Sequence, residues 1–287
     1  MLRTKNFWLL GGDGRQAALA GLLAEDGHGV HTFALERAPG AACQRTLEGL
    51  GLAHCVILPL PAGDGAGGLN APLSGVRCPL GEIVHAMAPG QLLCAGMADE
   101  GLRGLARERG LVLRDYFARE ELAVLNAIPT AEGAIQIALE QLPVTLHDAR
   151  ALVAGFGRLG RALAPRLRAL GARTWVAARG YDQRAIARGM GLEAEGLEGL
   201  RDWLCSFDLV VNTVPAPLFG LEELAALKQG ALVIDLASRP GGVDRGAADT
   251  LGVRVIHALS LPGKTAPVTA GRYIQETVYH IMEELGV

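Results

Sequence analysis

Residues 150–161 read RALVAGFGRLGR, and this stretch decides the fold of the second half of the chain. An apolar run from Ala151 to Ala154 is typical of a buried strand, and a helix is expected over 161–170. Gly155 permits a tight turn, Gly157 lets a phosphate approach the backbone, and Gly160 lets the helix pack closely on the strand. The spacing predicts a dinucleotide-binding Rossmann unit with contacts from Gly155, Phe156, Gly157, Arg158, Leu159 and Gly160.

The next expected strand, over 174–179, ends in Ala178 and Arg179. NAD-binding units usually carry a carboxylate here, which binds the ribose diol and would repel a 2′-phosphate. A guanidinium can instead bind that phosphate in bidentate fashion. Arg179 therefore favours NADP over NAD, and the simpler alternative is a solvated surface arginine.

Three further strands are expected over 208–215, 231–237 and 253–258, and ligands of open α/β sheets bind at the carboxyl ends of such strands. The first ends in Thr213, Val214 and Pro215, which we expect beside the nicotinamide ribose. Asp235 ends the second strand at the same edge. His257 ends the third, where an ordinary, partly buried histidine is the favoured interpretation. A loop over 261–267 then presents Lys264, either to a ligand or only to solvent.

The first half of the chain repeats the pattern less clearly. A strand over 7–10 leads through the turn Gly11 to Arg15 into a helix over 16–25. Aligning Gly12 with Gly155 places Gly14 opposite Gly157 and Glu36 opposite Arg179. Because the charge of Asp13 would oppose a pyrophosphate, we expect this turn to serve the substrate instead. Arg15 could bind a substrate carboxylate or simply pair with Asp13.

The alternation of strands and helices predicts an α/β protein with two Rossmann-like doubly wound parallel-sheet domains and an interdomain cleft. A helix over 129–141, with Thr130 as its N-cap, marks the boundary. The expected domains are 1–125, joined by a C-terminal helix over 268–287, and an NADP-binding domain over 126–267. Arg15 and Lys264 would then face each other across the cleft.

The amino-acid composition argues against several classes of function. The 287 residues are 50% hydrophobic and 20% charged, which suits two globular domains. A net charge of −3 and 5% aromatic residues argue against nucleic acid and anionic membranes as partners. Five cysteines without a CxxC pair indicate reduced, mostly buried thiols, and no metal-ligand spacing occurs. With no room for a signal peptide and no apolar run near the ~18 residues of a membrane span, we expect a cytoplasmic protein.

Several longer segments carry a family resemblance. They are 11–13 with Arg15, 125–134, 155–160, 176–179, 212–215, 235–244, and 261–267 with 269–271, of which 126–133 and 235–244 are the most specific. Through them nearly the whole chain resembles the A subunit of dipicolinate synthase, the sporulation enzyme of endospore-forming bacteria. The chain departs from that family at Val268, where a lysine is expected, and over 257–260.

The resemblance implies an NADP-dependent oxidation that completes the pyridine ring of dipicolinate. The substrate would be a dihydro- or hydroxytetrahydro-dipicolinate, and the flavoprotein-like B subunit of that enzyme would be the partner. A dicarboxylate substrate needs cationic contacts, for which Arg15, Lys264 and Arg239 are the candidates. Asp13 or Asp235 would accept the proton.

Two alternatives stay open. One is an NADP-dependent dehydrogenase of the shikimate or methylene-tetrahydrofolate type, whose usual first-domain lysine has no counterpart among Lys5, Lys228 and Lys264. The other is a non-catalytic NADP-binding regulatory protein. The sequence leaves the oligomeric state open, a homo-oligomer included.

Overall fold

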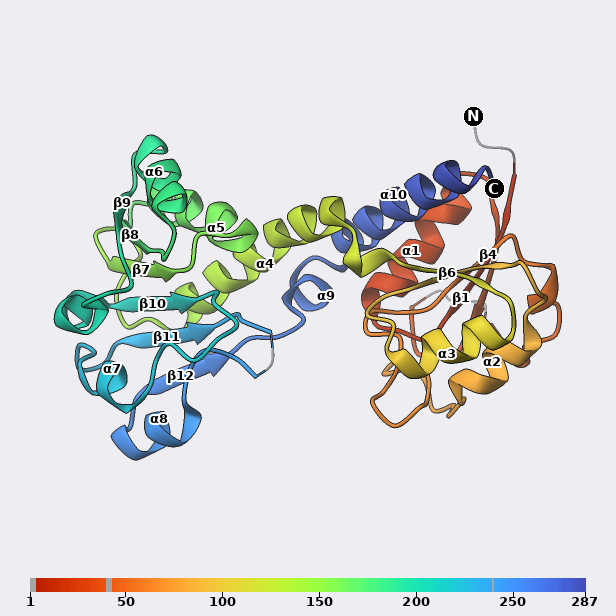
Figure 1. Ribbon diagram of the computed structural model, residues 1–287, viewed down its shortest axis with the longest axis horizontal. Helices are drawn as coiled ribbons and strands as arrows, with labels where there is room; N and C mark the ends of the chain where they lie inside the picture. The colour runs from red at the N-terminus through yellow and green to blue at the C-terminus, as the bar shows by residue number, and fades with distance from the viewer. Residues whose placement is uncertain (1–3, 40–42, 239) are drawn as a thin grey trace. The chain divides into compact units, whose positions relative to one another are not determined.

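The computed structural model describes residues 4–39, 43–238 and 240–287 and divides the chain into two compact units (Figure 1). The first unit contains the residues up to Asn126 together with Pro262–Val287, and the second is Ala127–Leu261. The first unit is therefore discontinuous in sequence. Compared with the expected boundaries, residues 262–267 lie in the first unit, not with the nucleotide-binding residues.

The first unit is built on a parallel sheet of six strands in the order β3-β2-β1-β4-β5-β6. These strands are β1 (Asn6–Leu10), β2 (Gly29–Phe33), β3 (Cys43–Gln44), β4 (Cys55–Ile57), β5 (Leu92–Ala95) and β6 (Val112–Asp115). Its helices are α1 (Gly14–Glu25), α2 (Leu80–Ala86), α3 (Glu100–Glu108) and α10 (Pro267–Leu285), with short 3-10 turns at Leu50–Leu52 and Tyr116–Ala118.

The second unit has a parallel sheet in the order β9-β8-β7-β10-β11-β12, the same crossover pattern as the first. Its strands are β7 (Arg150–Ala154), β8 (Arg173–Ala177), β9 (Glu193–Glu195), β10 (Leu209–Asn212), β11 (Leu232–Asp235) and β12 (Arg254–His257). Its helices are α5 (Arg158–Ala169), α6 (Tyr181–Gly189), η3 (Leu200–Ser206), α7 (Leu221–Ala225) and α8 (Arg245–Leu251). The prediction of two Rossmann-like units is confirmed.

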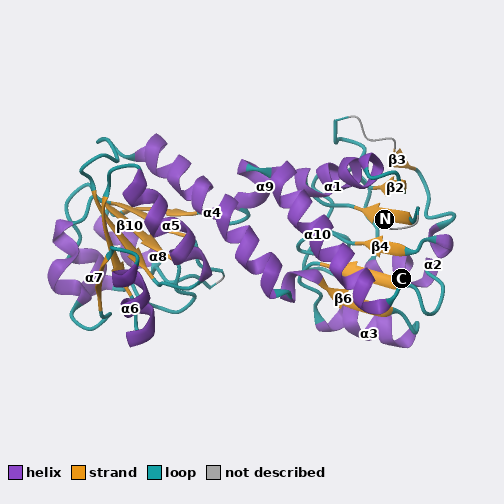
Figure 2. Ribbon diagram, turned by 90° about the horizontal axis from the view of Figure 1, so that it is seen from above, coloured by secondary structure: helices purple, strands orange, loops and turns teal. Residues whose placement is uncertain are grey.

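Both sheets are covered by helices on their two faces, as Figure 2 shows for each unit. In β7, Ala151 and Val153 pack in a core with α5, whereas Leu152 and Ala154 pack in a second core with η3 and α7. This alternation follows from the two-residue period of a strand. Because both faces are buried, the strands read as continuous apolar runs instead of alternating ones.

The C-terminal helix α10 packs on the first sheet beside α1, in one core with Phe7 and Leu9 of β1. The two helices approach closely at Gly271, where a Cβ would come within 2.9 Å of the carbonyl oxygen of Arg15. The expectation that the last helix returns to the first domain agrees with this packing.

The helix expected over 129–141 is longer than predicted, because α4 runs from Glu120 to Gln141 with Pro129 inside it. Thr130 therefore lies in the middle of this helix and is not its N-cap. The expected start at Pro129 rested on the rule that proline lacks the N–H of an interior helical residue. Glu120 and Glu121 instead occupy the first turn, where the helix dipole favours acidic residues.

By length and composition α4 could also cross a membrane, which corrects the expectation that no apolar run comes near that length. Half of its most apolar window is buried inside the protein. Core helices of water-soluble proteins pass the same test, so this helix alone is weak evidence for a membrane.

Candidate functional site

The glycine turn of the second unit joins β7 to α5 and is shaped by two of its three glycines. Gly155 has a φ of +94°, and a Cβ there would collide with the hydroxyl oxygen of Thr213. A Cβ on Gly160 would collide with the carbonyl oxygen of Gly155. These two glycines therefore allow the turn, the helix and the tip of β10 to pack together.

Gly157 has a different environment. A Cβ at this position would meet no atom within 4 Å, so the space beside the backbone is open. Gly157 is also the N-cap of α5, and no side chain caps the first N–H groups of that helix. Free N–H groups and the positive end of a helix dipole together bind phosphates well. The residues present thus fit the pyrophosphate of a dinucleotide.

The equivalent turn of the first unit is closed by the protein itself. A Cβ on Gly14 would lie 3.2 Å from Pro267. Asp13 caps α1, accepting a hydrogen bond of 3.0 Å from the backbone N–H of Arg15. A carboxylate therefore occupies the end of α1 where a phosphate would have to bind.

Glu36, which stands opposite Arg179 in the repeat, also has an internal role. Its carboxylate accepts hydrogen bonds from the backbone N–H of Gly75 at 2.7 Å and the hydroxyl of Ser74 at 2.9 Å. The bond from Gly75 is the main cause of a lowered pKa of Glu36. This acid therefore helps to fix the loop around Ser74 and Gly75 through one of its two oxygens.

The other predicted cofactor contacts lie on the carboxyl edge of the second sheet. Ala178 follows β8 and donates its N–H to the carbonyl of Glu195 at 3.0 Å, while Arg179 is exposed. Within the described part of the chain, Arg179 makes no hydrogen bond or ion pair. Arg179 is therefore available to a ligand.

The sequence analysis did not single out Arg184, a second arginine in the helix that follows Arg179. The guanidinium of Arg184 lies 4.4 Å from the ring centroid of Tyr181, whose side chain is 85% exposed. Both residues belong to α6, which begins two residues after Arg179. The three-residue spacing of an aromatic residue and an arginine, at the start of this helix, was the available signal.

The tip of β10 is attached to the glycine turn. Both the backbone N–H and the hydroxyl of Thr213 donate to the carbonyl of Ala154 at 2.9 Å. Val214 is half-buried and Pro215 is exposed. The predicted residues of the turn and of this tip are thus brought together at one edge.

Asp235 lies at the neighbouring strand tip and is buried, with 2% of its surface exposed. One oxygen accepts from the Asn212 side-chain amide at 2.8 Å and the Ala237 N–H at 3.1 Å. The other accepts from the Gly242 N–H at 3.1 Å and lies 3.3 Å from Nδ1 of His257. A carboxylate with this many donors organises two loops and is poorly suited to accept a proton from a ligand.

In the first unit, Arg15 and Asp13 form an ion pair, which was the simpler of the two alternatives for Arg15. Nη2 of Arg15 lies 2.8 Å from Oδ2 of Asp13 and also donates to the carbonyl of Leu60 at 2.6 Å. The Arg15 side chain is only 7% exposed, against 32% for Asp13. Most of the Arg15 guanidinium is therefore occupied inside the protein.

Lys264 belongs to the first unit and not to the nucleotide-binding unit, which corrects its expected place. The expected loop contains a short helix, α9 (Leu261–Thr265). A Cβ on Gly263 would come within 2.7 Å of Oδ2 of Asp13 and 3.0 Å of Nε of Arg15. Lys264 itself is exposed, so it and the Asp13–Arg15 pair are neighbours on one unit and not residues on opposite units.

Arg239, the third candidate cation, lies outside the described residues. Among the described residues, no group of three or more His, Cys, Asp and Glu side chains is arranged as a metal site. All five cysteines are free thiols, of which Cys55, Cys78 and Cys94 are buried. Burial raises the pKa of Cys55 and of Cys78, so these thiols are unreactive.

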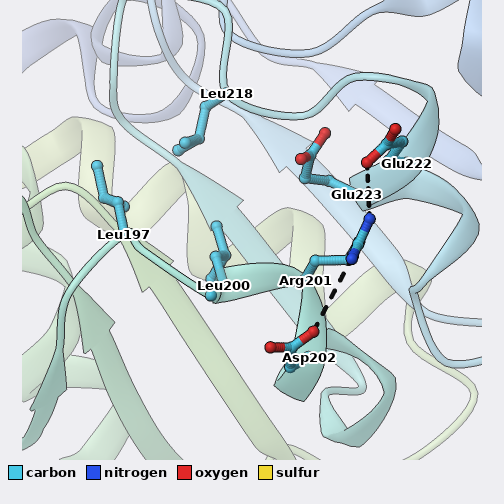
Figure 3. A pocket seen from close by; sticks show the side chains of 8 residues that line it. Leu197, Leu200, Arg201, Asp202, Leu218, Glu222 and Glu223 are labelled. Carbon is cyan, nitrogen blue, oxygen red and sulfur yellow. Dashed lines mark hydrogen bonds and ion pairs between the residues drawn. The ribbon is translucent and has the colours of Figure 1, made fainter.

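A hollow of about 240 Å³ opens in the second unit near the loops that follow β9 and β10 (Figure 3). Leu197, Leu200 and Leu218 line its apolar side. An ion pair of 2.7 Å between Arg201 and Glu222 crosses its rim. None of the predicted cofactor contacts lines this hollow.

Comparison with known proteins identifies relatives of both units. Residues 6–117 match the family model of the N-terminal domain of the dipicolinate synthase A subunit. Residues 130–249 match the NAD binding domain of D-isomer specific 2-hydroxyacid dehydrogenases. The second match covers the glycine turn, Arg179 and the tips of β10 and β11.

Whole-chain relatives agree with these matches. The A subunit of dipicolinate synthase from Bacillus subtilis (strain 168) is 28% identical, over 99% of this chain and 98% of that protein. The crystal structure of the same subunit from Bacillus halodurans has a TM-score of 0.90 at 29% identity, covering 98% of this chain and 99% of that one. The crystal structure of the A subunit from Bacillus subtilis has a TM-score of 0.88 at 28% identity, covering 100% of this chain and 98% of that one.

The chain is thus similar along its whole length to the A subunit of dipicolinate synthase, as the sequence motifs indicated. Its second unit is a nicotinamide-dinucleotide-binding domain of the dehydrogenase type. The coarse function is that of a component of an NAD(P)-dependent oxidoreductase.

Proposed function

We propose that this chain is the NADP-binding component of an oxidoreductase that forms dipicolinate from a dihydro- or hydroxytetrahydro-dipicolinate during spore formation. One observation carries the proposal. The open, uncapped glycine turn lies at the same sheet edge as the available Arg179, in a chain that resembles the dipicolinate synthase A subunit from end to end. We place its activity in the cytoplasm, where reduced thiols are the normal state.

In this proposal the backbone from Gly155 to Gly160 binds the pyrophosphate, with Phe156, Arg158 and Leu159 completing the turn. Arg179 binds the 2′-phosphate, and the small, buried Ala178 leaves room for the ribose. Thr213, Val214 and Pro215 line the nicotinamide ribose. When bound, the nicotinamide supplies a hydride acceptor, and the protein orients the substrate ring toward it.

The substrate carboxylates require cationic partners. Lys264 is the exposed candidate among the described residues of the first unit. Arg15 is largely occupied by Asp13 and Leu60, so we assign the Asp13–Arg15 pair a positioning role beneath Gly263. Replacing Lys264 with alanine would weaken binding of a dicarboxylate more than binding of a monocarboxylate analogue.

A non-catalytic regulatory role is the second candidate, and one observation favours it. Both acids first considered as proton acceptors have internal partners, Asp13 with Arg15 and Asp235 with three N–H donors and His257. A protein that binds NADP but leaves the chemistry to its partner would need neither acid to be available.

Reconstitution separates these functions. The purified chain, with and without a partner that resembles the B subunit of dipicolinate synthase, is supplied with NADP and freshly generated dihydrodipicolinate. Dipicolinate is detected by terbium luminescence and the reduced cofactor by its absorbance. We expect NADPH and dipicolinate to appear in equal amounts. Product without NADP reduction would support the regulatory role, and no product with the partner present would refute the proposed function.

A further inference from the structure

A histidine at the carboxyl edge of the second sheet has no role in the function described so far. His257 is the last residue of β12 and lies beside Asp235 in the strand register, which in turn lies beside Asn212. Its side chain is 12% exposed, and its Nδ1 is 3.3 Å from Oδ2 of Asp235. The three strand tips thus carry a connected row of polar side chains at the edge where the nicotinamide is proposed to bind.

The partners of Asp235 determine which imidazole nitrogen carries a proton. Its carboxylate accepts hydrogen bonds from Asn212, Ala237 and Gly242, as expected of an ionised, acceptor-only group. A nitrogen that contacts such an oxygen must donate. Nδ1 of neutral His257 therefore bears the hydrogen, and Nε2 bears a lone pair.

Nε2 of His257 is buried and has no hydrogen-bond partner among the described residues. Buried acceptors without a partner are rare and destabilising, and they indicate a missing ligand or a functional role. Gly241 lies over the ring, where a Cβ would be 3.3 Å from Cε1. A side chain at residue 241 would have to displace the imidazole by a few tenths of an ångström.

The proposed oxidation needs a proton acceptor. Removing two hydrogens from neighbouring saturated ring carbons of a dihydrodipicolinate releases one as hydride, with its electron pair, to the nicotinamide. The second C–H bond breaks to leave its electron pair in the new ring double bond, and its proton must go to a base. Asp13 and Asp235 are both engaged, whereas the lone pair of Nε2 of His257 has no hydrogen-bond partner among the described residues.

We propose that His257 is the catalytic base of this oxidation and that Asp235 is a positioning residue, which fixes its tautomer and stabilises the imidazolium that forms. The inference rests on the proposed function. The Asp235 carboxylate lies 3.3 Å from Nδ1 of the ring, and the backbone of Gly241 lies beside Cε1. The carboxylate is opposite in charge to the imidazolium that forms on proton transfer.

The first test needs no substrate. Nitrogen-15 NMR of histidine-labelled protein reports the tautomer, and the His257→Gln variant assigns the signal. We expect the Nδ1–H tautomer in the free protein. The Nε2–H tautomer would refute the inference, because Nε2 would then be a donor and not a base.

The second test is kinetic, in the assay with the partner protein. His257→Gln should lower kcat/KM by about 10²- to 10⁴-fold, the usual contribution of general acid–base catalysis. It should also remove the acidic limb of the pH profile, and added imidazole should restore part of the rate. The affinity of this variant for NADP should stay within about twofold of the wild-type value, because the proposed dinucleotide contacts are made by other residues.

A matched control comes from His147, which lies 3.6 Å from Asp148 in the same unit but is 77% exposed and precedes β7. His147→Gln should keep the wild-type rate and pH profile. A His257→Gln variant with wild-type kcat/KM would refute this inference alone. An inactive wild-type enzyme would instead refute the proposed function, and this inference with it.

Discussion

Replacing Arg179 with alanine tests the proposed cofactor most directly. Arg179 is exposed and makes no hydrogen bond or ion pair with the described residues, so its loss should leave the free energy of unfolding nearly unchanged. A charge-assisted hydrogen bond is worth about 1.5–3 kcal/mol. Because the site is open to solvent, we expect the lower end of this range, which corresponds to about a tenfold weaker affinity for NADP.

Isothermal titration calorimetry with NADP and NAD measures this effect. The affinity for NAD should hardly change, so the preference for NADP should fall by about the same tenfold factor. Rising salt should weaken the preference in the wild type more than in the variant, because screening acts on an exposed charge pair. Arg184 leaves a second positive charge in the helix that follows Arg179, so a smaller preference should persist.

Arg173→Ala is the matched control, since it removes an exposed arginine from the amino end of the same strand, where Arg173 pairs with Asp148 at 3.0 Å. It should leave both affinities unchanged. If Arg179→Ala retains the full NADP preference, or loses NAD and NADP affinity equally, the assignment of the 2′-phosphate site is wrong.

Other substitutions test the rest of the structure. Gly157→Ala should weaken dinucleotide binding about tenfold in calorimetry, because the added Cβ fills the open space beside the backbone where the phosphate is proposed to bind. The melting temperature should not change. Gly189→Ala, at another glycine whose Cβ would meet no atom, is the control. Gly155→Ala should lower the free energy of unfolding by about 2 kcal/mol in urea titration, because it combines a positive φ with a collision at Thr213. Asp13→Asn should destabilise the protein by about 3 kcal/mol, leaving the charge of Arg15 buried without its partner; unchanged unfolding would refute a structural ion pair. Hydrogen bonds from Arg119 hold the pKa of Glu284 and of Glu121 below the ordinary value. The stability that these two carboxylates contribute is therefore present at neutral pH and is lost as the pH falls through the lowered pKa values. Glu284→Gln should flatten the decline of the melting temperature below about pH 4.5, and a decline parallel to that of the wild type would contradict this prediction.

The sequence predicted the features that depend on local spacing. The glycine pattern, the apolar strands and the repeat between the halves all follow from short-range steric rules, and the two sheets agree with them. Arg179 also follows the end of β8, as its position in the sequence predicted. Such features need no knowledge of which distant segments come together.

The predictions that the structure contradicts, and the features that the sequence did not show, depend on packing between segments far apart in the sequence. Pro129 was expected to start a helix, yet the helix continues on both sides of it. Lys264 was expected in the second domain because it follows the last strand, whereas residues from Pro262 onward pack on the first unit. The unpartnered nitrogen of His257 depends on burial and on the partners of Asp235, which no sequence pattern records.

The return of α10 to the first sheet also has a consequence for biosynthesis. The core around Phe7, Leu9, Leu19 and Leu23 is closed by Ile274, Val278 and Ile281, which leave the ribosome only after the whole second unit. Domains generally fold as units during synthesis. The second unit, continuous from Ala127 to Leu261, can therefore complete its fold while the earlier-made half still exposes apolar surface. The first unit is therefore synthesised first but completes its fold last, and in that interval chaperones can bind its exposed apolar surface.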